Sequence, residues 1–77
     1  MSLLQEFTEA RAAALSPDRV SYGPGSSDKR LARELGRRLE SGRPFTPRQF
    51  QVAAYLAWRY RRQIDASLVP ARPASKP

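Results

Sequence analysis

The amino-acid sequence predicts a small all-α fold, in which three helices form one domain over residues 1–68 and a disordered, basic, proline-rich tail occupies residues 69–77. Two observations support this fold class. Apolar residues recur every three or four positions in three separate segments, as they do on the buried side of a helix. Proline, glycine and serine separate these segments and supply helix start and stop signals. We expect the helices over residues 2–15, 28–41 and 47–66.

The first expected helix begins after Ser2, which can cap it, and Gln5 is placed to complete a capping box. Ser16 and Pro17 end the helix, because the residue before a proline avoids the helical conformation. The apolar positions predict the side that faces the core: Leu3, Leu4, Phe7, Ala10, Ala14 and Leu15.

The second expected helix follows a turn-forming linker, Gly23-Pro24-Gly25, and ends at Gly42. Ser27 is the expected cap at its start, and Gly36 suggests a close approach of a neighbouring helix. The stripe expected in the core is Leu31, Ala32, Leu35 and Leu39. The opposite side is basic and carries Lys29, Arg30, Arg33 and Arg37, partly offset by Glu34 and Glu40. Arg30 and Glu34 are spaced to form an ion pair along the helix.

The third expected helix has the clearest start. Thr46 and Gln49 form a capping box, Pro47 occupies the first helical position, and Phe45 and Phe50 form a hydrophobic staple. The predicted core side is Phe50, Ala53, Ala57, Tyr60, Ile64 and Leu68, with Ala54 and Leu56 beside it. Near the end, Asp65 is predicted to pair with Arg61 or Arg62.

The other side of this third helix carries Arg48, Gln51, Tyr55, Trp58, Arg59 and Arg62. Aromatic rings and guanidinium groups together suit stacked bases and phosphates. They equally suit a protein–protein hot spot. In a domain this small, Tyr55 and Trp58 can instead simply complete the core.

The charge of the chain is asymmetric. Fourteen basic residues against seven acidic ones give a net charge of +7. Residues 1–18 hold one arginine and three acidic residues, whereas residues 19–77 hold thirteen basic and four acidic residues. Such a distribution favours nucleic acid or another acidic partner for the C-terminal two-thirds. The alternative is an ordinary solvated, arginine-rich surface.

The sequence lacks the residues from which most catalytic and metal sites are built. The chain has no histidine and no cysteine, and its carboxylates are scattered, so we expect neither an enzyme nor a metal or other cofactor. The start of the chain is acidic and lacks a basic signal-peptide region, and no apolar run is long enough to span a bilayer. We therefore expect a cytoplasmic protein.

Three stretches of the chain, Ser27-Asp28-Lys29-Arg30, Pro44-Phe45-Thr46-Pro47-Arg48-Gln49 and Tyr60-Arg61-Arg62-Gln63-Ile64, resemble small uncharacterised proteins encoded by bacteriophages. The resemblance covers residues 27–64. It implies a phage regulator that acts in host takeover by binding a host machine, with RNA polymerase as the foremost target, or by binding nucleic acid.

These observations leave three functional hypotheses. The leading one is a non-enzymatic regulator that docks on a bacterial nucleoprotein machine such as the transcription complex. The second is direct, weakly specific binding of DNA or RNA by the basic sides of the second and third helices, and the third is steric inhibition of a bacterial defence or replication enzyme. The candidate binding residues are Arg48, Tyr55, Trp58, Arg59, Arg62, Lys29, Arg33, Arg37, Arg72 and Lys76.

Overall fold

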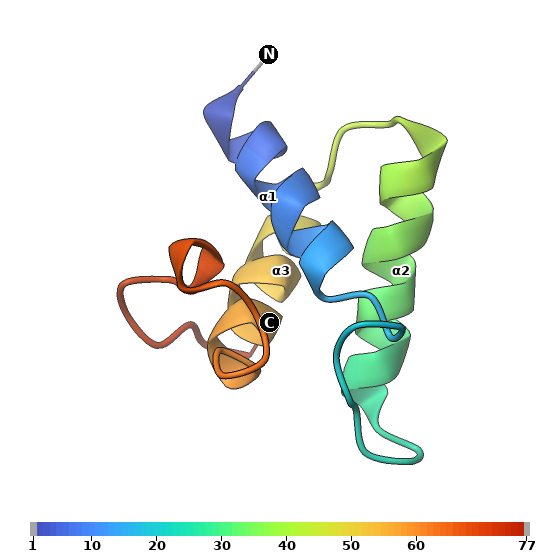
Figure 1. Cartoon of the computed structure of the whole chain (residues 1–77). Helices are drawn as coiled ribbons and strands as arrows, with labels where there is room; N and C mark the ends of the chain where they lie inside the picture. The colour runs from blue at the N-terminus through green and yellow to red at the C-terminus, as the bar shows by residue number, and fades with distance from the viewer. Residues whose placement is uncertain (1, 77) are drawn as a thin grey trace.

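The computed structural model describes residues 2–76 and confirms the all-α fold. Helix α1 spans Leu3–Ala14, α2 spans Ser27–Ser41 and α3 spans Pro47–Arg59 (Figure 1). A single 3₁₀ turn, η1, follows at Ala66–Leu68. Each of the three helices packs against the other two, so the described chain is a three-helix globule of 34 × 26 × 21 Å.

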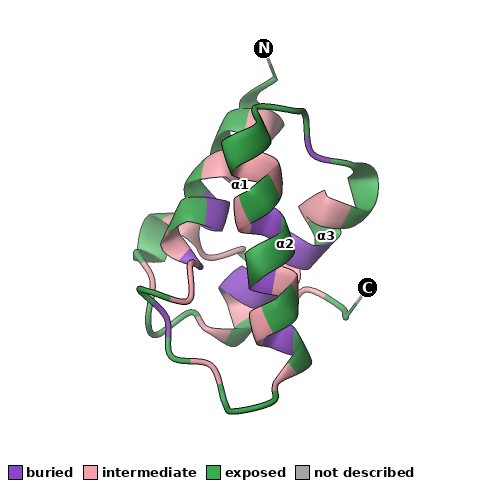
Figure 2. Cartoon of the chain, turned by 90° about the vertical axis from the view of Figure 1, so that its right-hand side faces the viewer, coloured by how far each residue is buried: buried purple, intermediate pink, exposed green. Residues whose placement is uncertain are grey.

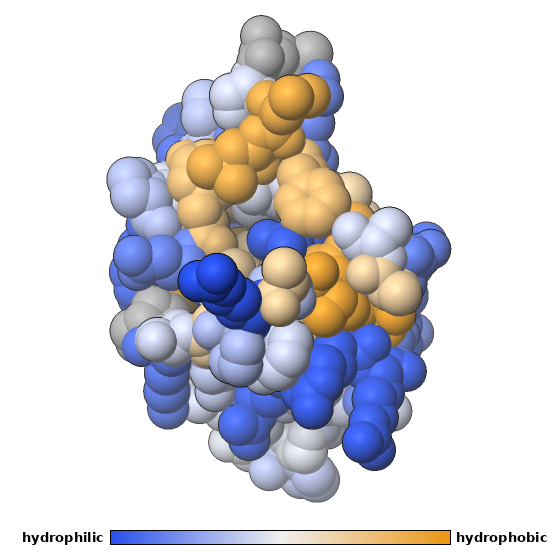
Figure 3. All heavy atoms as spheres, turned by 90° about the vertical axis from the view of Figure 1, so that its left-hand side faces the viewer, coloured by the Kyte–Doolittle hydropathy of each residue, from blue (hydrophilic) through white to orange (hydrophobic). Residues whose placement is uncertain are grey.

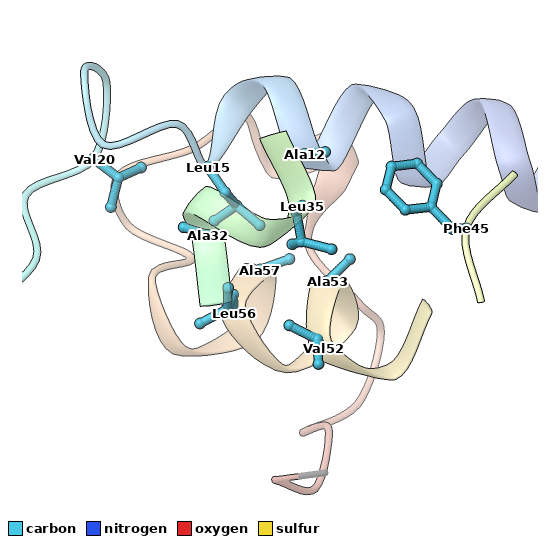
Figure 4. Close-up of a cluster of buried hydrophobic side chains, with 10 residues drawn as sticks. All are labelled: Ala12, Leu15, Val20, Ala32, Leu35, Phe45, Val52, Ala53, Leu56 and Ala57. Atoms are coloured by element: carbon cyan, nitrogen blue, oxygen red, sulfur yellow. The ribbon is translucent and has the colours of Figure 1, made fainter. Parts of the chain in front are cut away.

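The core lies where the three helices meet (Figure 4). Its largest fully buried apolar side chains are Leu15, Leu35 and Leu56, which come from the end of α1, the middle of α2 and the second half of α3. Alanines from all three helices are buried in it. The remaining core residues are Ala12, Val20, Ala32, Phe45, Val52, Ala53 and Ala57.

Helix starts were predicted to within one residue. The Ser2 hydroxyl accepts from the Gln5 amide at 3.0 Å, and the Ser26 hydroxyl, rather than that of Ser27, accepts from the Asp28 amide at 3.1 Å. The expected capping box at Ser2 is incomplete, because the Gln5 side chain accepts instead from the Phe45 amide at 2.9 Å. That bond ties α1 to the segment before α3.

The start of α3 is confirmed in every detail. The Thr46 hydroxyl accepts from the Gln49 amide at 3.1 Å, and the Gln49 side chain accepts from the Thr46 amide at 3.0 Å. The rings of Phe45 and Phe50 lie with centroids 6.3 Å apart. Gly42, which ends α2, has the left-handed backbone (φ 72°) that favours glycine.

The prediction for the core side of α1 was right for Leu15, which is fully buried, and wrong for most of the other residues. Leu3 is 82% exposed, Leu4 52% and Phe7 37%, and Ala10 is exposed as well. The buried side of the helix carries Thr8, Arg11 and Ala12 instead, and it leads to the predicted Leu15 just past its end. Arg11 can be buried because its Nε donates to the Leu68 carbonyl at 2.9 Å. Burial lowers the pKa of its guanidinium, which also lies 4.3 Å from the centroid of the Phe7 ring.

The third helix is shorter than predicted. It ends at Arg59, and residues 61–63 form a turn instead of the expected continuation to residue 66. Gln63 holds this turn against the linker, because its side chain accepts from the Ser21 amide at 2.9 Å and donates to the Ser21 carbonyl at 3.4 Å. Asp65 forms no predicted arginine pair among the described residues; it accepts from the Ser67 amide at 2.9 Å and so caps η1. That bond lowers the pKa of Asp65.

Two smaller predictions for α2 were also wrong. A Cβ at Gly36 would meet no atom within 4 Å, so this glycine does not mark a close approach of a neighbouring helix. Within residues 2–76, Arg30 and Glu34 form no ion pair, and both are exposed. The stripe expected in the core is half right, since Ala32 and Leu35 are buried and Leu31 and Leu39 only partly so.

Candidate nucleic-acid interface

The basic side of α2 forms a continuous exposed face. Packing of Ala32 and Leu35 into the core turns the opposite side of the helix outward, as Figure 2 shows. On that side Arg30, Arg33 and Arg37 are exposed, and Lys29 is partly exposed. Positions 30, 33 and 37 lie three and four residues apart, so their guanidinium groups share one face of the helix.

Two shallow hollows open along this face. The first is bordered by the loop before α2 and by the first three turns of the helix, and the second by the last two turns and the start of α3. They share Glu34 and Arg37, so the two hollows adjoin along α2. Arg38 and Arg43 add two further cations in the second hollow. Arg38 is fixed there, because its Nε donates to the Pro44 carbonyl at 2.8 Å.

The end of α3 joins the start of α2 through one buried carboxylate. Asp28 accepts from the Tyr60 hydroxyl at 2.7 Å and from Arg59 Nε at 2.9 Å, both at Oδ2. The Asp28 side chain is 7% exposed and that of Arg59 is 58% exposed. Arg59, a predicted binding residue, is therefore engaged by the fold on one side and open to solvent on the other.

Two tyrosines pack together behind this junction. The rings of Tyr22 and Tyr60 meet edge to face, with centroids 4.7 Å apart, and the Tyr22 hydroxyl donates to the Leu15 carbonyl. Burial raises the pKa of Tyr22, and Tyr60 and Asp28 raise it further. The pKa of Tyr60 is also raised, first by burial and then by its hydrogen bond to Asp28. Both hydroxyls therefore stay protonated to a higher pH than that of an ordinary tyrosine.

The two aromatic residues on the outer side of α3 have different surroundings. Tyr55 is partly buried and packs against the core. Trp58 is not among the side chains of the described residues that do so. Trp58 is partly exposed and lies beneath Arg61, whose guanidinium carbon is 4.5 Å from its ring centroid. Arg61 is held in place because its Nη1 donates to the Trp58 carbonyl at 3.0 Å. The prediction left open whether these aromatics belong to the core or the surface. In the structure Tyr55 packs against the core, and Trp58 lies at the surface under Arg61.

The predicted binding residues do not form one site. Lys29, Arg33 and Arg37 lie together on the α2 face. Arg62 cannot share a helical face with Trp58, because α3 ends three residues earlier; it borders a separate hollow lined by residues 59–63. Arg48 is exposed in the first turn of α3, and Arg72 and Lys76 are exposed in the segment after η1, which has no regular secondary structure up to residue 76.

Four arginines of these surfaces are absent from the predicted set: Arg30, Arg38, Arg43 and Arg61. The sequence contained a signal for the first, since Arg30 lies at the same helical face as Arg33 and Arg37. Its spacing to Glu34 predicts an ion pair instead, which the structure does not contain within residues 2–76. Arg43 and Arg61 lie outside the helices, so helical periodicity could not place them.

Within residues 2–76, no group of three or more acidic residues is arranged to hold a metal ion. In the same residues, no helix combines the length and the apolar character needed to cross a membrane. No protein-family model matches the chain, no curated protein is significantly similar to it, and no solved structure is either. The resemblance to phage proteins therefore stays a prediction.

Proposed function

We propose that this chain is a non-enzymatic protein that binds the phosphate backbone of nucleic acid through the basic face of α2. The observation that supports the proposal most directly is the surface along α2 on which Arg30, Arg33 and Arg37 are exposed beside the partly exposed Lys29, with Glu34 as the one acidic residue lining the same hollow. Guanidinium groups are the side chains best suited to phosphate oxygens, because they donate two parallel hydrogen bonds.

The dimensions of the face fit this ligand. A helix of 15 residues is about 22 Å long. Double-stranded DNA carries about one phosphate charge per 1.7 Å of its axis, so the face spans several phosphates. Arg38 and Arg43 extend the positive surface at one end of α2, and Arg59 adds a partly free cation near the other end.

The chemistry of the face indicates affinity with little sequence selectivity. Contacts to phosphate position a protein on nucleic acid but carry no direct sequence information. Binding driven by this face is therefore expected to be salt-dependent and weakly specific.

A second candidate function rests on Trp58. A tryptophan that is partly exposed, and that is stacked by an arginine, is a common centre of a protein–protein interface. This residue supports our alternative proposal that a phage-type regulator docks on a bacterial nucleoprotein machine such as the transcription complex. In that case Trp58 and Arg61 contact protein while the α2 face contacts the nucleic acid of the same machine.

The test is a titration of fluorescently labelled duplex DNA and single-stranded RNA, measured by anisotropy at several salt concentrations. With about four phosphates neutralised, the logarithm of the association constant for the duplex should fall with the logarithm of salt concentration with a slope of about −4. Arg33→Glu with Arg37→Glu should weaken binding by at least about thirtyfold, since two attractive contacts become repulsive.

Because the proposal places the contacts on α2, the matched control is Arg19→Glu with Arg72→Glu, which changes the net charge equally at two exposed positions that line neither hollow of that face. It should weaken binding only about threefold, through the long-range field. Equal losses in the two double variants would show that net charge alone drives binding, and an absence of binding at low salt would exclude the proposal. Trp58→Ala should leave this titration unchanged and abolish capture of a protein partner if the second candidate is right.

A further inference from the structure

The exposed apolar side of α1 is an unusual feature of a chain this basic. Leu3, Phe7 and Ala10, which are exposed, and Ala14, which is partly exposed, form a stripe with spacings of four, three and four residues. Leu3, Leu4, Glu6, Phe7 and Ala10 line a shallow hollow there. Figure 3 views the molecule from the left-hand side of Figure 1 and shows orange, apolar atoms gathered in the upper half of that side. Spacings of four and three are those of the residues that meet along the seam of two paired helices.

From this stripe we infer that α1 pairs with α1 of a second copy of the chain, in antiparallel orientation. The two large side chains of the stripe, Leu3 and Phe7, lie in the first half of the helix, and the two small ones, Ala10 and Ala14, lie in the second half. In an antiparallel pair centred between positions 8 and 9, Leu3 meets the partner's Ala14 and Phe7 meets the partner's Ala10.

This arrangement fits large residues against small ones at every layer of the seam, and the two-fold axis makes the fit identical for both chains. A parallel pair would instead place Phe7 against Phe7 and Ala10 against Ala10, which crowds one layer and leaves a gap in the next. The pattern of sizes is therefore complementary to itself in one orientation.

The distribution of charge leaves this surface open to a second copy. Two chains of +7 repel each other, and residues 19–77 carry thirteen of the fourteen basic residues. The α1 side is where this repulsion is weakest, because its one arginine, Arg11, is 8% exposed and turned toward the Leu68 carbonyl. The rim carries Glu6, which in the antiparallel pair lies opposite the partner's uncharged Ala13, so no like charges meet directly.

The test is sedimentation equilibrium of the full chain over a range of concentrations. We expect a reversible monomer–dimer equilibrium. Ala10→Glu places a carboxylate against the partner's Phe7 without removing any side chain from the core, and should raise the dissociation constant at least about tenfold. The control Gln51→Glu makes the same charge change at an exposed position on α3 and should leave the dissociation constant unchanged. A chain that stays monomeric at every concentration overturns the inference.

The orientation is tested by disulfide cross-linking, which is clean because the chain contains no cysteine. Leu3→Cys and Ala14→Cys chains, mixed and oxidised, should form the mixed dimer faster than either forms a dimer with itself. Rapid self-linking of the Leu3→Cys chain would show a parallel pair and overturn the antiparallel assignment. Circular dichroism of each variant verifies that its helices are intact.

Discussion

The two ends of α3 are stabilised in different ways. At its start, Phe45, Thr46, Pro47, Gln49 and Phe50 form the capping box and the hydrophobic staple, and these residues lie within six positions of one another. At its end, Tyr60 binds Asp28 across 32 positions, and the following turn is tied to the linker across 42 positions. The start is therefore a property of a short peptide, and the end is a property of the folded domain.

This difference explains why one end was predicted and the other was not. A capping box acts through side chains that reach three residues along the chain, so its sequence pattern is sufficient evidence. After Arg59 the sequence continues with Arg61, Arg62 and Gln63, which favour helix, and no glycine or proline stops it. Local propensity there gives way to the hydrogen bonds that Tyr60 and Gln63 make to distant segments.

Removing the carboxylate at the long-range end should have the largest effect on stability. Asp28→Ala leaves the Tyr60 hydroxyl without its acceptor in a partly buried position and removes an acidic residue from the first turn of α2. We expect a loss of about 2–3 kcal/mol in the free energy of unfolding, measured by urea denaturation. The ion pair with exposed Arg59 should add little to this loss.

The control for this prediction is Asp18→Ala, which removes an exposed carboxylate from the linker. It should change the unfolding free energy by less than about 0.5 kcal/mol. Equal effects of the two substitutions would show that Asp28 contributes only its charge, and the end of α3 would then need another explanation. Asp28→Asn should fall between the two, since an amide oxygen can still accept from Tyr60.

The same contrast between local and long-range contacts decides how much of the fold could be predicted. Helix starts and the glycine that ends α2 depend on near neighbours, and they were predicted to within one residue. The side of α1 that faces the core was predicted less well. Its apolar residues favoured the side of Leu3 and Phe7, whereas the buried side includes Arg11, which is bonded to Leu68, 57 positions away. No periodicity in the sequence indicates that an arginine has such a partner.

The candidate site follows the same rule. The basic face of α2 was predicted because its residues share one regular helix whose other side is apolar. The proposed grouping of Trp58 with Arg62 required α3 to continue, and it failed with the end of that helix. Arg61, which actually covers Trp58, lies in the turn, where its position depends on tertiary structure.

Alkaline pH should weaken the long-range end selectively. The pKa values of Tyr22 and Tyr60 are raised above the ordinary 10.0 in the folded chain, chiefly by burial. Their contribution is fully present below pH 10 and is lost as pH rises, because the unfolded chain releases these protons first. We expect the unfolding free energy to fall above pH 10, by at most about 1.4 kcal/mol per pH unit for each tyrosine.

The pH profile is measured by urea denaturation between pH 8 and about 11, values that bracket the ordinary tyrosine pKa. Tyr22→Phe should flatten the alkaline fall, although it also loses the bond to the Leu15 carbonyl and is less stable at neutral pH. For Thr46→Ala, the unfolding free energy plotted against pH should run parallel to that of the natural chain, at lower values throughout. An equally steep fall in the Tyr22→Phe chain would mean that the fall originates elsewhere.

The smallest expected effect belongs to the local end. Thr46→Ala removes the hydroxyl that accepts from the Gln49 amide and should cost about 1 kcal/mol. In a domain of this size that loss corresponds to a fall of about 4–8 °C in Tm, measured by circular dichroism.

Gln49→Ala should cost less, because the Thr46 amide it leaves free is exposed to water. If the box acts as a unit, the double substitution should cost less than the two single losses together, since each half of the box positions the other. Additive losses would show two independent hydrogen bonds, and an unchanged Tm would mean that the start of α3, like its end, is held by tertiary contacts such as the one between Phe45 and Gln5.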